Sequence, residues 1–449
     1  MSKSQGKNHP SGHLSVTLDN LIGDSSHISC ERSAFVINGL TVVSWIYYNP
    51  KVTQRTPIIV CHGGPSFPHN YLLPMKLLTE FGYPVIFYDQ AGCGESTFVD
   101  DPVSDAPWLL DIPYYVEELS ALIHHLQLYE FYLYGHAWGA CVVQEFALAT
   151  CTSNDAMLRG LMGILLDSAF SDGELYSQTL WKERISTMPL FTQNLLKKII
   201  ADKAFDSPHY HDIENTFTSQ FMIRLSPRPD IFTASLKKMN RSVYKELQGP
   251  SEFILSGLLQ NWSVTNDLWK IQVPTLVMRG EYDLSTESCS QTLVDSISTA
   301  WPAVTIPRAG YCKLIDEPHE CIKQITRFLN TLEGVHHRYK VSTAVALRRP
   351  ESSNGGDIPS SSPRQRSASG SFDNNCASPG RLFRRLLPNS PAVDEKSLSL
   401  LDENSLPPMD LPPVVILPQA VLPSVIYTMP PGVDDDNSEE SKLEGVAKF

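Results

Sequence analysis

The sequence Leu133-Tyr134-Gly135-His136-Ala137-Trp138-Gly139-Ala140 joins two different hydrophobic patterns. An apolar run ends at Gly135, and a helical pattern begins near Gly139. Two glycines at this spacing between a strand and a helix are typical of a sharp turn, which holds its central residue in a strained conformation at the end of the strand. That central residue is Ala137, whose side chain has no nucleophilic atom. The turn therefore predicts a strand followed directly by a helix, without the hydroxyl that such turns often carry.

Short apolar segments alternate with helical patterns on both sides of this turn. In the segment 114–126, for example, Val116, Leu119 and Leu122 fall on one helical face. Strands that are apolar throughout and separated by helices are typical of a parallel sheet covered on both faces. The expected strands are 58–61, 85–88, 131–134, 161–166, 274–278 and 303–306, and the expected helices include 71–81, 114–126 and a closing helix over 318–332.

The amino-terminal part of the chain has a different pattern. Two β-branched and aromatic runs, 31–37 and 40–48, are joined by Asn38-Gly39, a strong signal for a β-hairpin. We therefore expect the sheet to begin with an antiparallel hairpin. Residues 1–28 are polar and are expected to be frayed or loosely attached.

The strand pattern stops between residues 171 and 262. Only helical patterns occur there, among them 179–198 and 211–225. This block predicts a helical lid inserted after the sixth strand of an α/β domain. The lid would divide the core into a first part, 29–170, and a second part, 263–334.

Residues 335–449 are rich in Ser, Pro, Asn and Arg. Such a segment cannot bury enough apolar surface to offset its ordering entropy, so we expect it to be disordered. Two basic clusters, 364–369 and 381–385, lie beside serines whose phosphorylation could switch the local charge. The apolar stretch 411–427 contains four prolines, which forbid a helix and predict an extended docking peptide for a protein partner.

The composition limits the class of protein. A formal charge of −13 argues against a nucleic acid or an anionic membrane as partner. The first 20 residues contain no apolar signal region, and no uncharged apolar run reaches 18 residues, so a soluble cytoplasmic protein is expected. Nine cysteines without a CxxC pair suit reduced thiols better than disulfides or zinc. We predict no metal and no cofactor.

Five motifs follow one another along residues 30–332. They are HGGP at 62–65, YDQAGCG at 88–94, GHAWG at 135–139, GPSEF at 249–253 and GEYD at 280–283. In this order, with a lid in the corresponding place, they resemble the proline iminopeptidases (prolyl aminopeptidases). That resemblance implies the α/β-hydrolase fold and a serine-type aminopeptidase ancestry.

The resemblance also implies a catalytic triad of Ser, Asp and His in chain order. Ala137 stands at the nucleophile position and Asp283 at the acid position, while the loop of the base histidine holds Tyr311. A phenol, with a pKa of about 10, cannot act as a base at neutral pH as imidazole does. A lone Ala137 would suit an engineered substrate trap, but the second loss at Tyr311 favours an evolved loss of catalysis.

Other site residues follow from the same resemblance. Gly63 and Gly64 belong to the glycine loop that supplies one half of an oxyanion hole, and Trp138, after the nucleophile position, supplies the other half. Ser66 stands where the family usually has glycine, so the loop is expected to be stiffer or differently aimed. Glu252 matches an acidic residue that holds the amino end of the substrate. A second glutamate that the family commonly has is here Leu284.

A relocated catalytic set is the alternative to a loss of activity. The candidate nucleophiles are Cys93, Cys141 and Cys312, each of which also reads as a small buried hydrophobe. The candidate bases are His62, His136 and His319.

The leading hypothesis is a proline iminopeptidase-like pseudoenzyme that binds a small amine-bearing molecule, a peptide or a protein. The alternative is an active aminopeptidase, amidase or esterase with rearranged residues. A third hypothesis is a scaffold that acts through the Pro-rich segment of its tail.

Overall fold

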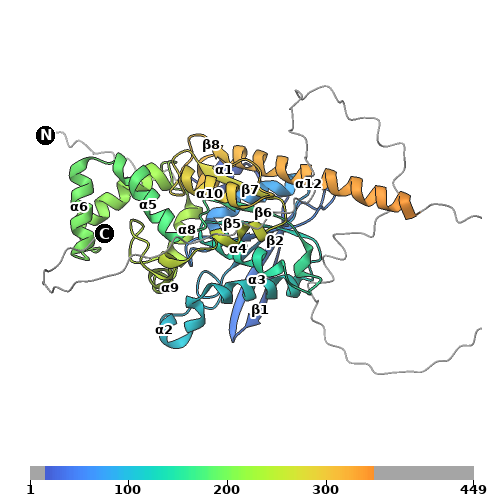
Figure 1. The fold of residues 1–449 in the computed structure, drawn as a ribbon, viewed down its shortest axis with the longest axis horizontal. Helices are drawn as coiled ribbons and strands as arrows, with labels where there is room; N and C mark the ends of the chain where they lie inside the picture. The colour runs from blue at the N-terminus through green and yellow to red at the C-terminus, as the bar shows by residue number, and fades with distance from the viewer. Residues whose placement is uncertain (1–15, 348–449) are drawn as a thin grey trace, which may run out of the picture. The chain divides into compact units, whose positions relative to one another are not determined.

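The computed structural model describes residues 16–347, with side chains for residues 16–334. Its centre is one eight-stranded sheet with the strand order β1-β2-β4-β3-β5-β6-β7-β8 (Figure 1). Strand β2 runs antiparallel to both neighbours, and all other pairs are parallel. The strands are β1 (Ser29–Ile37), β2 (Leu40–Tyr48), β3 (Ile58–Cys61), β4 (Val85–Asp89), β5 (Phe131–His136), β6 (Leu161–Asp167), β7 (Thr275–Gly280) and β8 (Val304–Ile306).

The predicted strand pattern and the α/β-hydrolase fold class are confirmed. In the β1–β2 hairpin, Asn38 and Gly39 have φ values of 49° and 80°, as a two-residue turn of this type requires. Strands β3 to β7 are buried almost throughout because helices cover both faces of the sheet.

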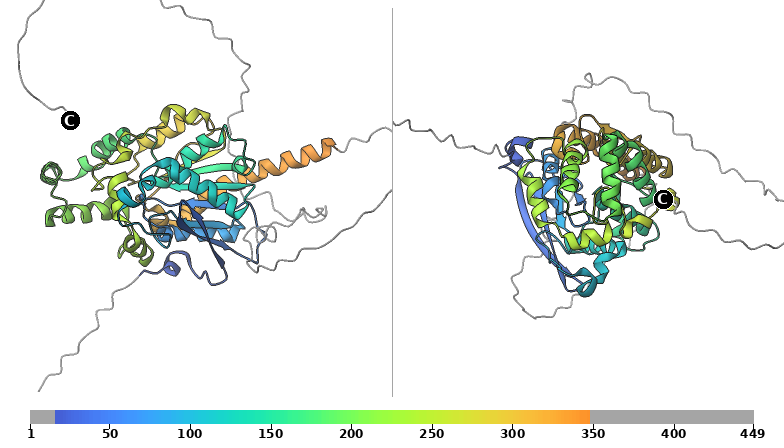
Figure 2. Two further views of the ribbon diagram at one scale, coloured as in Figure 1. Left: turned by 90° about the horizontal axis from the view of Figure 1, so that it is seen from below. Right: turned by 90° about the vertical axis from the view of Figure 1, so that its left-hand side faces the viewer.

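Helices form a layer on each face of this sheet (Figure 2). On one face the sheet packs against α3, α4 and α10, and on the other against η1, α11 and α12. The helices are α1 (Leu18–Ile22), η1 (His69–Phe81), α2 (Pro102–Asp105), η2 (Pro107–Leu110), α3 (Ile112–Leu126), α4 (Trp138–Thr150), η3 (Leu158–Gly160), α10 (Glu287–Ser296), α11 (Lys313–Asp316) and α12 (Pro318–Leu347).

A helical insertion follows β6, as predicted. Its helices lie together beyond one end of the sheet (Figures 1 and 2). They are α5 (Gly173–Glu183), η4 (Ile185–Thr187), α6 (Leu190–Ala201), α7 (Pro208–Phe217), the π-helical turn η5 (Thr218–Met222), α8 (Asp230–Lys238), α9 (Arg241–Leu247) and η6 (Leu258–Asn261). The short helix η7 (Thr265–Lys270) follows the insertion and contacts α4 and α10 of the core.

Four details of the sequence-based prediction were wrong. The single helix expected over 179–198 is broken before Pro189, because proline lacks an N–H group and its ring clashes with the preceding turn. In place of the helix expected over 211–225, an α-helix ends at Phe217 and a π-helical turn over Thr218–Met222 follows it. Residues 18–22, expected to be loosely attached, form α1 with Ile22 buried. The closing helix runs to Leu347 instead of 332, since Gly334 costs a helix only about 1 kcal/mol.

The remaining predictions for the tail lie outside the described residues. These are the disorder of 348–449, both basic clusters and the Pro-rich segment 411–427. Within residues 16–347, no helix combines the length and the apolar character needed to cross a membrane.

Candidate functional site

The turn after β5 keeps a strained geometry. Ala137 adopts φ 51° and ψ −112°, a conformation that favours glycine. Neither glycine of the turn has room for a side chain. A Cβ atom on Gly139 would lie 2.1 Å from the Cys61 carbonyl oxygen, and one on Gly135 would lie 2.5 Å from the Gly139 carbonyl oxygen. The backbone of a nucleophile-bearing turn is therefore retained around a methyl group.

Replacing Ala137 with glycine is expected to raise the free energy of unfolding by about 1 kcal/mol, because glycine adopts a positive φ without strain. Urea unfolding followed by circular dichroism measures the change. Ala140→Gly is the matched control, since Ala140 lies inside α4, where the same exchange is expected to cost about 1 kcal/mol or more. Equal losses in the two variants would show that the backbone at Ala137 is not strained.

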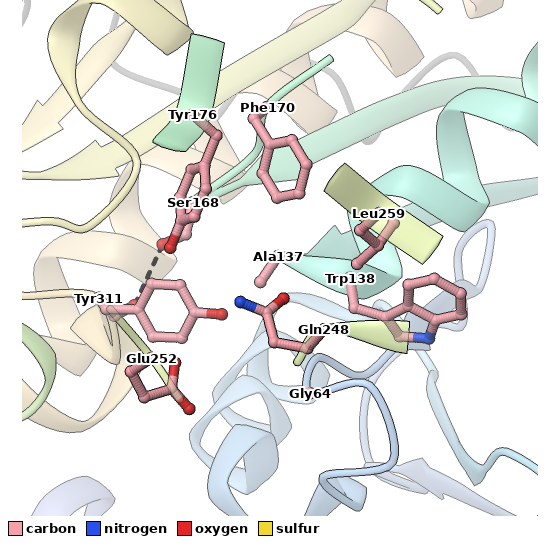
Figure 3. Close-up of a pocket in the computed structure, with 10 residues that line it drawn as sticks. All are labelled: Gly64, Ala137, Trp138, Ser168, Phe170, Tyr176, Gln248, Glu252, Leu259 and Tyr311. Carbon is pink, nitrogen blue, oxygen red and sulfur yellow. Dashed lines mark hydrogen bonds between the residues drawn. The ribbon is translucent and has the colours of Figure 1, made fainter. Parts of the chain in front are cut away.

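The glycine loop after β3 lies beside Ala137. Gly64 and Trp138 line the same pocket as Ala137 (Figure 3). Their backbone N–H groups donate to no other group among residues 16–334. The Gly63 N–H, in contrast, donates to the Tyr71 hydroxyl at 2.9 Å. Of the three predicted oxyanion residues, Gly64 and Trp138 therefore lie at the pocket. The N–H group of Gly63 is already hydrogen-bonded to the Tyr71 hydroxyl.

Ser66 connects this loop to the helical insertion. It adopts a φ of 59°, the kind of conformation that a glycine would take at this position. Its buried hydroxyl donates to the Asn240 carbonyl at 2.6 Å, just before α9 of the insertion. The serine hydroxyl thus ties the loop to the lid.

Tyr311 occupies the pocket next to Ala137. Its ring lies between Ala137 and Glu252, and its hydroxyl points into the pocket towards Gln248 (Figure 3). Burial raises the pKa of this phenol well above its ordinary value, so the side chain is neutral near pH 7. The space left for the centre of a water molecule is about 10 Å³, which is enough for about one water. The pocket is therefore nearly filled.

Asp283, the predicted acid, is buried and fully engaged by other groups. Its carboxylate accepts hydrogen bonds from Ser168 Oγ at 2.7 Å, the Gly280 N–H at 2.8 Å and the Ser285 N–H at 3.0 Å. In addition, Lys313 Nζ lies 3.1 Å from Asp283 Oδ2. No histidine contacts this carboxylate among the described residues. Asp283 thus has a complete set of partners that serve structure.

Lys313 is the centre of a buried ion cluster that the sequence analysis missed. Its ammonium lies 2.6 Å from Asp167 Oδ1, donates to Ser168 Oγ at 2.5 Å and reaches the Tyr311 carbonyl at 3.3 Å. The side chain is completely buried, and the two carboxylates outweigh burial and raise the pKa of the lysine above its usual value. Lys313 is therefore a fixed positive charge. It links the ends of β6 and β7 to the Tyr311 loop.

A signal for this cluster was present in the sequence. Asp167 and Asp283 each follow an apolar strand, and the carboxyl ends of parallel strands meet at one edge of the sheet. Two acids brought together there need a cation, and Lys313 lies in an otherwise apolar stretch two residues after Tyr311. Local patterns alone do not show it, because most lysines are exposed.

Glu252, the predicted substrate-binding residue, lines the pocket. It accepts a hydrogen bond from the Tyr244 hydroxyl, and burial raises its pKa to about 7. No cation lies within ion-pair distance of this carboxylate among the described residues. Leu284, in the place of the second glutamate, is buried and apolar. Glu252 is therefore the one acidic group of the pocket that an amine could still pair with.

The candidate cysteines lie outside the set of residues that line the pocket. Cys93, Cys141 and Cys312 are buried, and burial raises the pKa of each thiol well above its ordinary value. None of them is among the residues that line the pocket. Cys93 Sγ does lie 3.7 Å from His62 Nε2, but that nitrogen already accepts the Gln90 N–H at 3.0 Å. Protonated thiols in such surroundings are poor nucleophiles.

The candidate bases are equally occupied or distant. Burial lowers the pKa of His62 to about 4. His136 is held between two partners, with Nδ1 2.8 Å from the Tyr71 hydroxyl and Nε2 3.1 Å from the Tyr311 carbonyl. Its ring packs edge-on against Tyr311, with centroids 4.6 Å apart. His319 is exposed on α12. The histidine nearest to Ala137 thus positions Tyr311 instead of acting as a base.

The fold and this edge of the sheet define a class of protein. The sequence profile of the alpha/beta hydrolase family matches residues 58–324, which is more than half of the chain. The chain therefore belongs to the α/β-hydrolase family.

Its relatives within that family are proline iminopeptidases. The proline iminopeptidase of Saccharolobus solfataricus is 30% identical over 293 residues, which cover 64% of this chain and 89% of that protein. The enzyme of Heyndrickxia coagulans is 30% identical over 278 residues, covering 62% and 91%. The crystal structure of the Mycobacterium smegmatis proline iminopeptidase superposes with a TM-score of 0.62 at 27% identity, covering 68% and 100%. Within the α/β-hydrolases this is a proline iminopeptidase-like chain, as the five motifs predicted.

Proposed function

We propose that this protein is a non-hydrolytic member of its family that acts by binding. The observation that carries the proposal is the position of Lys313, whose ammonium lies 3.1 Å from the acid Asp283. In a working triad the acid orients a histidine and stabilises its positive charge. Here Asp283 pairs with a permanent cation, Lys313, instead of a histidine. Ala137 and Tyr311 supply neither a nucleophile nor a base.

One observation favours a second candidate, a hydrolase with a relocated nucleophile. Ser168 lines the pocket, and Lys313 Nζ lies 2.5 Å from its Oγ, as in a serine–lysine dyad. Such a dyad requires a neutral lysine, whereas Lys313 is held protonated between Asp167 and Asp283. The Ser168 hydroxyl also donates its proton to Asp283 at 2.7 Å. These contacts leave no base to activate the hydroxyl, so the non-hydrolytic reading is the stronger one.

Glu252 gives the proposal a ligand class. Its pKa of about 7 indicates a carboxylate that lacks a cation, and an ammonium group would supply one. The room beside it holds about one water, so an amine-bearing ligand has to displace the Tyr311 or Gln248 side chain on entering. Binding coupled to movement of Tyr311 is therefore the expected mode.

Purified protein is expected to hydrolyse neither proline 4-nitroanilide nor short 4-nitrophenyl esters above the buffer rate. Absorbance of the released chromophore measures this, with a proline iminopeptidase relative assayed in parallel as the positive control. Ser168→Ala is the matched variant and is expected to leave the result unchanged. Turnover by the unmodified chain that disappears in Ser168→Ala would overturn the proposal in favour of the serine–lysine alternative.

A further inference from the structure

The segment between β4 and α3 exposes apolar side chains at the surface. Phe98 is 49% exposed, Val103 is 57% exposed and Trp108 is 37% exposed. They lie on the loop that contains α2 and η2, at the periphery of the fold (Figure 1). We refer to this stretch as the 98–111 surface. Exposed apolar side chains mark interaction sites when they form a contiguous patch, and these three lie within eleven residues of one another in the sequence.

The same stretch carries acidic groups that have no cation. Asp100, Asp101, Asp105 and Asp111 are exposed, and none forms an ion pair with a lysine, arginine or histidine among residues 16–334. Residues 98–111 themselves contain no lysine or arginine, and the basic side chains of the neighbouring α9, Arg241 and Lys245, form no ion pair with these four aspartates. The 98–111 surface therefore combines negative charge with apolar contact area. A partner that fits it carries arginine or lysine next to large apolar side chains.

The chain itself contains a segment of this composition. Residues 381–387 read Arg-Leu-Phe-Arg-Arg-Leu-Leu, with three guanidinium groups, four apolar side chains and no acid. This segment lies outside the described residues. We propose that residues 381–387 dock on the 98–111 surface of the same chain, where their three arginines pair with aspartates of this surface and Leu and Phe side chains cover Phe98, Val103 and Trp108.

The length of the intervening chain permits this contact. Helix α12 ends at Leu347, so 33 residues, 348–380, connect it to the basic segment. An extended chain of that length spans about 110 Å, and a flexible one has a root-mean-square span of about 30 Å. A domain of the size of residues 16–347 has a diameter of about 50 Å, estimated from its expected radius of gyration. The segment can therefore reach any part of the domain surface.

Attachment in the same chain also favours this occupant over a separate basic partner. A tethered segment is present at an effective concentration of the order of millimolar, so even a weak contact is populated. The neighbouring acidic residues in the sequence, Asp373 and Asp394, lie several residues away from it on either side. The basic segment thus meets the 98–111 surface without competing charges of its own.

Photocrosslinking of the full-length chain tests the proposal. With p-benzoylphenylalanine in place of Phe383, irradiation and peptide mapping are expected to give crosslinks to residues 98–117 in a product that migrates as a monomer. The same group in place of Phe372, which has no arginine beside it, is the matched control and is expected to crosslink at least several-fold less to that region. Raising the salt from low to high concentration is expected to reduce the yield at 383, because exposed charge pairs are screened.

A second set of variants separates charge from simple proximity. Asp100→Asn with Asp101→Asn and Asp105→Asn is expected to reduce the crosslink yield from position 383 about tenfold, since three exposed charge pairs are lost. Asp202→Asn with Asp206→Asn, at exposed acids after α6, is the control and is expected to leave the yield unchanged. Crosslinks scattered over other surfaces, a yield insensitive to the three substitutions, or crosslinks found only between two chains would each overturn the proposal.

Discussion

Lys313→Met is expected to lower the free energy of unfolding by about 3–5 kcal/mol. The reason is the pair of carboxylates that this lysine neutralises. Asp167 and Asp283 are both buried, at 2.6 Å and 3.1 Å from Nζ, and methionine fills the volume without supplying a charge. Leaving two buried carboxylates without a cation costs far more free energy of folding than the packing of the methionine side chain contributes. The denaturant midpoint at pH 7, followed by circular dichroism, measures the loss.

Arg308→Met is the matched control for this substitution. Arg308 also forms an ion pair, with Glu317 at 2.8 Å, but its side chain is 74% exposed. Its removal is therefore expected to cost less than about 1 kcal/mol. Adding Asp167→Asn and Asp283→Asn to Lys313→Met is expected to recover much of the lost stability, since no unpaired charge then remains buried. If Lys313→Met were no more harmful than Arg308→Met, the cluster would have no structural role.

Ala137→Ser combined with Tyr311→His is expected to raise the hydrolysis of proline 4-nitroanilide about 10²-fold over the unmodified chain. A complete triad contributes about 10⁶ in kcat, and loss of the role of the acid alone removes about 10⁴ of it. Because Lys313 already engages Asp283, the double variant would have a nucleophile and a base but a poorly available acid. Each single substitution is expected to leave the protein inactive, since the triad works as a unit. Initial rates at saturating substrate measure the effect.

Two comparisons test this explanation. Ala140→Ser with Tyr311→His places the hydroxyl one turn along α4 instead of at the strained turn, and no activity is expected. Adding Lys313→Met to Ala137→Ser and Tyr311→His is expected to raise the rate further in the fraction that folds, because the carboxylate becomes free for the imidazole. If the double variant reached the rate of a complete triad with Lys313 in place, the proposed competition for Asp283 would be wrong.

The sheet was predictable because its signals are local. Each buried strand is a short apolar run, and the Asn38-Gly39 hairpin and the Gly135–Gly139 turn are fixed by residues that tolerate positive φ or close packing. The lid was predictable as a helical block but not in its breaks. Helical periodicity continues across Met188 and Pro189, and the break comes from the ring of Pro189, which the pattern of apolar residues does not report.

The residues of the candidate site could be predicted only where they align with motifs of the family. Ala137, Asp283, Tyr311 and Glu252 could be aligned with known motifs, and all four lie at one end of the sheet. Lys313 could not be found in that way, because its role depends on three loops that follow different strands. Its burial is a property of the tertiary structure, and the same residue in a local pattern would read as a solvated charge.

Under the proposed function, the Lys313 cluster also bears on whether substitutions in this chain could produce a working triad. A buried lysine between two acids opposes restoration of the triad, whichever substitution is made first. Removing it first destabilises the fold, and restoring the other two residues first yields only a weak enzyme. Under the proposed function, Lys313 is therefore an obstacle to catalysis that substitutions at positions 137 and 311 alone do not remove.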